Sequence, residues 1–320
     1  MPAGAVTVEV RQARADDHED VVAFTSDTWS DRFDRGDYIP EVFPEWVESD
    51  GSDQHTVVAV EDGRAVGVCQ VVALSAHETW AQGMRVADDA RAKGVAEAMN
   101  DACFAWARDR GATVCRNMVF SWNAPGLGAA RGVGYDPATE FRWAHPDPDV
   151  DARADSNGAS GLDAVADPDA AWSYWQRSDA ARELAGLTLD PDESWALSEA
   201  TRERFRAAAD DRWAVAVQGA DGTHGAAVRT REYEREGGEG EDDEDATERW
   251  VEYGVGAWDG VPAAQTLFAA IARDAADLDA DRTRVLIPET ARHVSDAAYA
   301  GIAVSENPDF VMAADLTRRD

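Results

Sequence analysis

Lysine is almost absent from this chain of 320 residues, in which Lys93 is the one lysine among 30 Lys and Arg side chains. Asp and Glu number 63, so the formal net charge is −33 and the pI is near 4.3. The electrostatic field of so negative a protein repels nucleic acids and anionic membranes, so neither is an expected partner. At molar salt, screening shortens the range over which carboxylates repel one another to about 3 Å. The composition therefore predicts an acidic, halophilic-type protein, although a GC-rich genome also favours arginine over lysine.

Cysteines and long apolar runs are also scarce. The three cysteines form no Cys-x-x-Cys pair and the six histidines lack metal-ligand spacing, so neither a disulfide framework nor a metal site is predicted. The longest mostly apolar run, residues 65–76, is too short to span a bilayer. Residues 1–10 lack the basic and apolar regions of a signal peptide. These absences favour a reduced, cytoplasmic location.

Proline, glycine and aspartate accumulate in the middle of the chain and indicate a boundary. We predict one domain at residues 1–145, an acidic Pro/Gly linker at 146–168 and a second domain at 169–320. Both halves contain an apolar strand, an Asp-Gly turn and a returning strand, so the pattern predicts an internal duplication. The acidic run 232–245 reads as a solvated loop within a hairpin of the second half.

A glycine-containing loop stands between a strand and a helix in the first half. The strand is Gly83-Met84-Arg85-Val86 and the loop is Arg91-Ala92-Lys93-Gly94-Val95-Ala96. Apolar residues then recur at helical spacing from Val95 to Trp106, and Gly111 marks the end of the helix. A glycine that opens a helix allows an anion to approach free backbone N–H groups. This segment therefore predicts a phosphate-binding loop.

The order and spacing of these segments resemble those of the GNAT acetyltransferases. The strand at 83–86 resembles the family's fourth strand, and the loop at 91–96 resembles its Arg/Gln-x-x-Gly-x-Gly/Ala motif. Asn123 and Gly134-Tyr135 resemble the family's Asn and Gly-Phe pair. The resemblance covers roughly residues 8–143. It implies an α+β fold of two tandem GNAT-like domains, each a mixed, mostly antiparallel twisted sheet flanked by helices.

The resemblance implies acetyl-CoA as co-substrate and no metal. Backbone amides should carry most of the binding, with Arg91 and Lys93 adding charge at the rim. The residues that it implies for cofactor binding are Met84, Arg85, Val86, Arg91, Ala92, Lys93, Gly94, Val95, Ala96, Asn123 and Gly126.

The chemistry that the resemblance implies is direct attack by an amine on the thioester, which needs a proton acceptor. Glu78 is the first candidate, with His77 and Glu97 as alternatives. Gln82 lies on the same strand and cannot titrate. The family's usual tyrosine acid is replaced by Ala130, so the proton donor to the leaving thiolate is not assigned.

Aromatic residues are expected around the acceptor: Trp29, Tyr38, Trp80 and Trp122. Core packing is the commoner role for any one of them. The segment Asp37-Tyr38-Ile39-Pro40 and the following Phe43 and Glu45-Trp46-Val47 are similar to histidine N-acetyltransferase-like members. This likeness favours a small amine or an amino acid as acceptor.

The second half lacks the loop motif. Its corresponding segment, residues 259–264, has no basic residue, and Pro262 supplies no N–H. We predict a degenerate GNAT-like domain without CoA binding, and a chain that is either a monomer built as a pseudo-dimer or a homodimer. The predicted function is acetyl transfer to a primary amine. A non-catalytic acyl-CoA sensor and a protein N-terminal or lysine acetyltransferase are the alternatives.

Overall fold

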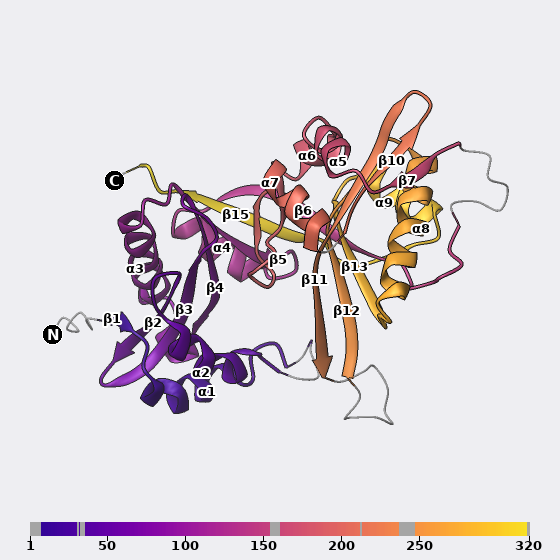
Figure 1. Ribbon diagram of the computed structural model, residues 1–320. Helices are drawn as coiled ribbons and strands as arrows, with labels where there is room; N and C mark the ends of the chain where they lie inside the picture. Colours follow the sequence, from indigo (N-terminus) through magenta and orange to yellow (C-terminus); the bar gives the residue numbers. More distant parts are fainter. Residues whose placement is uncertain are drawn as a thin grey trace. The chain divides into compact units, whose positions relative to one another are not determined.

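The computed structural model describes residues 8–30, 32, 36–153, 161–211, 213–236 and 247–318. The chain forms two compact units (Figure 1). The first comprises residues 1–119, 123–137 and 311–320, and the second comprises 120–122 and 138–310. The sequence-based boundaries at 145 and 169 stay a prediction. Among the described residues, no helix is long and apolar enough to cross a membrane.

The sheet of the first unit has the strand order β1-β2-β3-β4-β5-β15. Its first four strands are antiparallel neighbours, whereas β4 and β5 are parallel. Asp62 and Gly63 both have positive φ at the tight turn between β2 and β3, as the Asp-Gly signal predicts. The strands are β1 (Glu9–Gln12), β2 (Gln54–Glu61), β3 (Arg64–Ala73), β4 (Glu78–Val86), β5 (Val114–Phe120) and β15 (Asp309–Asp315).

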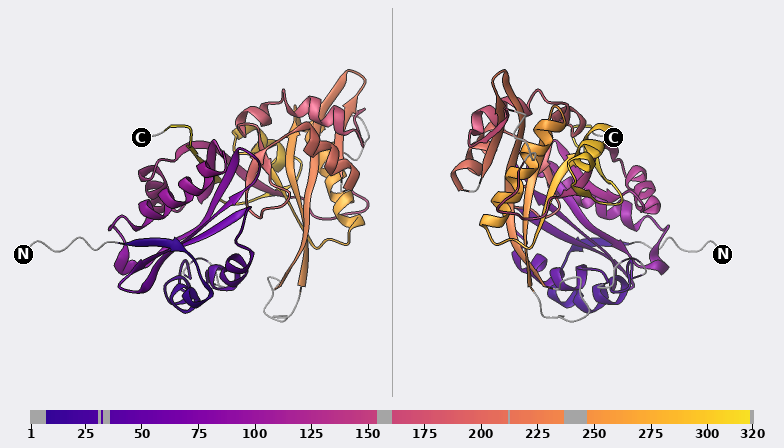
Figure 2. Two further views of the ribbon diagram at one scale, coloured as in Figure 1. Left: turned by 60° about the vertical axis from the view of Figure 1, so that its left-hand side comes forward. Right: turned by 90° about the vertical axis from the view of Figure 1, so that its right-hand side faces the viewer.

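Helices cover both faces of this sheet (Figures 1 and 2). Val58 packs with α1 (His18–Thr25) and α2 (Ile39–Ser49), while its neighbour Val57 packs with α3 (Val95–Asp109). Successive strand residues point to opposite faces, so these contacts place α3 opposite α1 and α2. The remaining elements of the unit are η1 (Ala15–Asp17), η2 (Asp88–Ala90) and α4 (Ala124–Gly132).

The second unit has the order β6-β13-β12-β11-β10-β7, with β14 also paired to β6. In the described part of this unit, β12 and β13 are parallel, whereas the pairs β6–β13, β6–β14, β11–β12, β10–β11 and β7–β10 are antiparallel. Its strands are β6 (Asp136–His145), β7 (Asp163–Val165), β10 (Ala214–Gly219), β11 (Gly222–Glu236), β12 (Thr247–Trp258), β13 (Arg282–Pro288) and β14 (Ala303–Val304). The β11–β12 hairpin contains the acidic run, of which residues 237–245 lie outside the described residues.

The helices of the second unit are α5 (Pro168–Trp175), α6 (Asp179–Glu183), α7 (Arg202–Asp211), α8 (Val261–Asp277) and α9 (Ala291–Tyr299). A separate hairpin consists of β8 (Leu187–Leu189) and β9 (Leu197–Glu199). Both units are thus mixed, mostly antiparallel sheets flanked by helices, which confirms the predicted fold class.

The last strand of each sheet comes from the other half of the sequence. Most of β6 belongs to the second unit, where it pairs with β13 from Phe141–Pro288 to Ala144–Val285. Conversely, the chain's C-terminal residues 311–320 belong to the first unit, where the Leu316 N–H donates to the Thr113 carbonyl at 2.9 Å. This exchange was not predicted from the sequence.

Candidate functional site

β4 and β5 separate after a short paired stretch. They pair at three positions only, from Glu78–Val114 to Trp80–Arg116. Beyond Trp80, no strand of the described chain pairs with the β5 side of β4. Residues 81–86 therefore leave roughly 17 Å of strand edge without a neighbouring strand. The N–H and C=O groups of such an edge can bind an extended ligand.

This edge leads into the loop before α3. Ala92 and Gly94 adopt left-handed φ values of +59° and +83°, and Gly94 is the N-cap of α3. No acceptor in the described chain takes a hydrogen bond from the backbone amides of residues 92–97. A Cβ at Gly94 would meet no protein atom within 4 Å. A row of free amides at a helix N-terminus, facing open space, fits an anionic pyrophosphate.

The two basic side chains of the loop are already paired with carboxylates. Lys93 Nζ lies 3.1 and 3.2 Å from the two carboxylate oxygens of Glu61. Arg91 lies 2.8 Å from Asp88 and also donates to the Val86 carbonyl at 3.3 Å. Much of their charge is therefore neutralised, so the backbone amides are the groups of this loop best placed to bind an anion.

The three predicted cofactor residues on β4 divide between the two faces of the sheet. Met84 and Val86 pack against the core that α3 covers. The Arg85 side chain instead forms an ion pair with Asp37, which precedes α2. This geometry therefore does not favour binding of the cofactor by the Arg85 side chain.

Glu78 lies at the end of β4 that pairs with β5, roughly 26 Å along the strand from Val86. Its side chain is buried and accepts hydrogen bonds from Arg116 at 2.5 Å and from the Ser75 hydroxyl at 3.0 Å. These contacts fit an ion pair that joins β4 to β5. His77 and Glu97, the alternative bases, are exposed. The role of Glu78 as base stays a prediction.

We expect Glu78→Gln to lower the free energy of unfolding by about 3–5 kcal/mol, because the buried Arg116 loses its carboxylate. Urea unfolding in high salt measures this. The double variant Glu78→Gln with Arg116→Gln should recover much of the loss, since it removes both charges. Unchanged stability combined with lost turnover would instead support Glu78 as the base.

Gln82 lies two residues beyond the last β4–β5 pair and starts a hydrogen-bonded relay across the sheet. Its Nε2 donates to Gln70 at 2.8 Å, Gln70 donates to Thr56 at 3.2 Å, and Thr56 donates to Asp50 at 3.0 Å. A carboxylate only accepts, so Asp50 fixes the direction of every bond in the relay. The amide nitrogen of Gln82 is therefore committed to the relay, which fixes the orientation of its side chain where β4 leaves β5.

Asn123 and Gly126 cap a helix together. Asn123 Oδ1 accepts from the Gly126 N–H at 3.0 Å at the start of α4. Their predicted contact with the cofactor stays a prediction. Ala130 is buried, as is Tyr135, whose hydroxyl lies 3.4 Å from Cys115 Sγ. Burial raises the pKa of Tyr135 well above its usual range, so Tyr135 does not offer an exposed acid in place of Ala130.

The four predicted acceptor aromatics do not form one cluster. Trp29 and Tyr38 lie around Arg85. Trp80 is only 2% exposed, which fits the core-packing role given above as the commoner one. Trp122 belongs to the second unit and stacks on Phe120 with ring centroids 5.0 Å apart.

The second unit repeats the strand separation, but its described residues lack a row of free amides like that of residues 92–97, which we call the cradle. β12 and β13 pair from Trp250–Arg282 to Tyr253–Val285 and then part. Two residues, Asp259 and Gly260, join β12 to α8, whereas eight residues join β4 to α3. Gly260 is extended rather than left-handed. At the point of separation, Thr188 of β8 donates to the Gly254 carbonyl at 2.7 Å. The unit's own hairpin thus occupies this edge.

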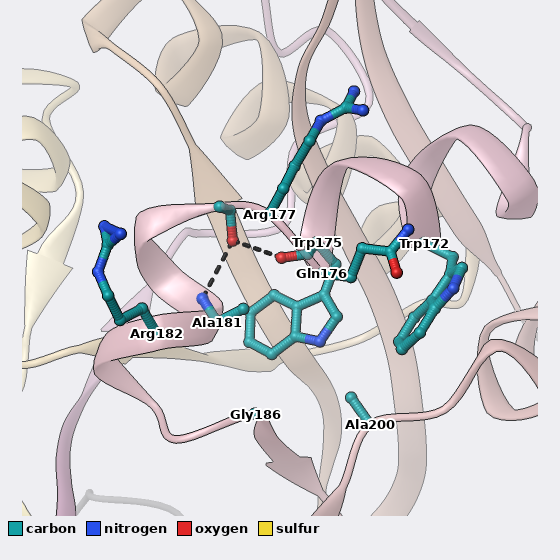
Figure 3. Close-up of a pocket in the computed structure, with 9 residues that line it drawn as sticks. Trp172, Trp175, Gln176, Arg177, Ala181, Arg182, Gly186 and Ala200 are labelled. Atoms are coloured by element: carbon teal, nitrogen blue, oxygen red, sulfur yellow. Dashed lines mark hydrogen bonds between the residues drawn. The ribbon is translucent and has the colours of Figure 1, made fainter.

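A pocket of about 370 Å³ lies beside α5 and α6 in the second unit (Figure 3). Arg177 and Arg182 extend away from the Trp175 ring, and Ser178 caps α6 through the Ala181 N–H at 3.0 Å. Its polar groups therefore do not converge on a ligand. In the part of the chain that the structure describes, no cluster of three or more His, Cys, Asp or Glu side chains could hold a metal. The pocket is lined by Trp172, Trp175, Gln176, Arg177, Ser178, Ala181, Arg182, Gly186 and Ala200.

Comparisons with known proteins bear on this geometry. Residues 18–135 match the acetyltransferase (GNAT) family. A search of curated proteins gives no significant match. The crystal structure of a GCN5-related N-acetyltransferase from Sphaerobacter thermophilus is similar over 97% of this chain and 96% of its own, with a TM-score of 0.61 and 15% identity. At that identity the likeness concerns the fold.

Two shorter structures are similar to part of the chain. The paia N-acetyltransferase from Thermoplasma acidophilum, in complex with coenzyme A, covers 41% of this chain and 91% of its own, at 14% identity and a TM-score of 0.38. The yncA structure from Salmonella typhimurium, with its cofactor acetyl-CoA, covers 42% and 83%, at 16% identity and a TM-score of 0.36. The family match, supported by the splayed strands and the glycine cradle, shows that this chain contains a domain of the GNAT acetyltransferase family at residues 18–135.

Proposed function

We propose that the first unit binds acetyl-CoA and transfers its acetyl group to the primary amine of a small molecule or an amino acid. One observation carries the proposal: the unpaired edge of β4 at residues 81–86 is joined, through a short connection that contains η2, to the free amides of residues 92–97. Acetyl-CoA would use both features at once, with its pyrophosphate at the free amides and its extended arm along the unpaired strand edge.

The chain's own groups have separate roles in this proposal. Amides at the cradle hold the pyrophosphate, and an N–H of the β4 edge polarises the thioester carbonyl as negative charge develops on its oxygen. The neutral amine attacks the carbonyl carbon, the C–S bond breaks, and the thiolate leaves. The nitrogen's extra proton passes to water or to a carboxylate, with Glu78 as the predicted acceptor.

The second unit, on this proposal, does not bind CoA, because its loop is short and its β8–β9 hairpin covers the equivalent edge. We further propose a monomer built as a pseudo-dimer, working in a cytoplasm of high salt. These statements rest on the strand order and the composition.

A non-catalytic acyl-CoA sensor is the second candidate. It is favoured by the buried Ala130 in place of a tyrosine acid and by the ion pair that holds Glu78. The same cradle would then bind the ligand without transfer.

We expect saturating acetyl-CoA to raise the melting temperature in high salt, since ligand at 100 times its Kd stabilises by about 2.7 kcal/mol. Release of free CoA, followed with a thiol reagent, should depend on an added small amine or amino acid. A thermal shift without CoA release for any amine or peptide would favour the sensor. Release with peptides alone would favour a protein acetyltransferase. No thermal shift would contradict all three.

A further inference from the structure

Arg85 lies within the open stretch of β4, yet its side chain is engaged by the segment between α1 and α2. Its Nε and Nη2 donate to the two carboxylate oxygens of Asp37 at 2.6 and 3.1 Å. The Asp37 side chain is fully buried and that of Arg85 is 12% exposed. Asp37 also accepts from the Ile39 N–H at 3.3 Å, at the start of α2. The pair therefore ties the beginning of α2 to β4.

Two aromatic rings surround the same guanidinium. The Arg85 Cζ lies 4.3 Å from the Trp29 ring centroid and 5.8 Å from that of Tyr38. Trp29 follows α1 and holds a left-handed φ of +61°, which a bulky residue keeps only when its surroundings impose it. A planar guanidinium can bind a carboxylate bidentately and stack on rings at once, which lysine cannot do.

A second contact joins α2 itself to β4. A Cβ at Gly83 would lie 2.5 Å from the Trp46 ring and 3.0 Å from Ile39, so α2 approaches the strand closely there. Gly83 and Arg85 are two residues apart and both face α2. The start of α2, with Asp37 and Tyr38 before it, is therefore held against the stretch of β4 along which the proposed function places the acyl chain.

We propose that Arg85 is a positioning residue that holds Trp29 and Tyr38 in place and so shapes the acceptor side of the site. The proposal rests on the proposed function and assigns the Arg85 side chain a role other than cofactor binding. It also removes Asp37 from the groups that could attract a cationic amine, because that carboxylate already binds Arg85.

The test compares Arg85→Met and Asp37→Asn with Arg110→Met, a control that also removes an arginine stacked on a tryptophan of the first unit. We expect hydrogen exchange of peptides containing Trp29 or Tyr38 to become about tenfold faster in the first two variants only. The acetyl-CoA Kd should stay within about twofold, while the acceptor KM rises about tenfold and kcat changes little. Arg85→Lys should restore only part of the protection.

Distinct outcomes would overturn the proposal. Unchanged exchange in both variants would show that Arg85 and Asp37 do not hold Trp29 and Tyr38 in place. A tenfold weaker acetyl-CoA Kd in Arg85→Met but not in Asp37→Asn would make Arg85 a cofactor ligand. If the wild type turns over no acceptor, the proposed function fails, while the exchange and binding measurements still decide whether Arg85 and Asp37 hold Trp29 and Tyr38 in place. If Arg85→Met does not fold, Asp37→Asn provides both measurements.

Discussion

Replacing Gly94 with alanine should weaken acetyl-CoA binding at least about tenfold, and replacing it with glutamate at least about a hundredfold. The Cβ would project into the open space in which the proposed pyrophosphate approaches the amides of residues 92–97. Glutamate would add a negative charge beside the phosphates. Isothermal titration in high salt measures both affinities.

The chain offers a matched control at the other end of α3. Gly111 has φ of +86°, close to the +83° of Gly94, and a Cβ there would also meet no protein atom within 4 Å. Both alanine variants should therefore lose a similar stability of about 1–2 kcal/mol through left-handed strain. Only Gly94→Ala should affect the acetyl-CoA affinity. Wild-type affinity in Gly94→Glu would show that the cradle is misassigned.

Deleting residues 311–320 should unfold the first unit and abolish acetyl-CoA binding. The deletion removes Met312, Ala314 and Leu316 from the core that α3 covers. Burial of a Met or Leu side chain contributes about 1.5–3 kcal/mol, which is a large share of a domain's usual stability of about 5–15 kcal/mol. It would also expose the edge of β5.

Hydrogen exchange of α3 and the acetyl-CoA thermal shift report this loss. A deletion of residues 318–320 is the control, because it keeps β15 and the Leu316 N–H bond to Thr113. A fragment of residues 1–145 also lacks β15, and we expect it not to fold alone. An isolated fragment that binds acetyl-CoA like the whole chain would contradict the expectation and support the domain boundary drawn from the sequence.

Local signals in the sequence predicted the backbone geometry of the loop before α3 and of the first hairpin. Gly94 before a helical apolar pattern gave the cradle, because a left-handed residue at a helix start needs glycine and depends on few distant contacts. The Asp62-Gly63 turn gave the β2–β3 hairpin for the same reason. The missing motif at 259–264 agrees with the two-residue connection before α8.

The side-chain roles were harder to predict, because their partners are distant in sequence. The sequence predicts Glu78 as the base, and its partner Arg116 lies 38 residues away. Arg85 looked like part of the cofactor strand, and its partner Asp37 lies 48 residues away. Neither pairing has a local pattern, since arginine and carboxylates occur throughout this chain.

The sequence by itself determined the α+β class and the left-handed glycine at the start of α3, both of which depend on hydrophobic periodicity and turn residues. The internal duplication and the binding of CoA at this glycine stay predictions. Only the tertiary structure decided that β15 completes the first sheet and that β6 belongs to the second unit. Both β6 and β15 have apolar residues that a sheet can bury, but the apolar pattern of a strand does not specify which strand it pairs with. Which sheet each strand joins depends on which sheet edge lets the strand bury its apolar face against the rest of the fold.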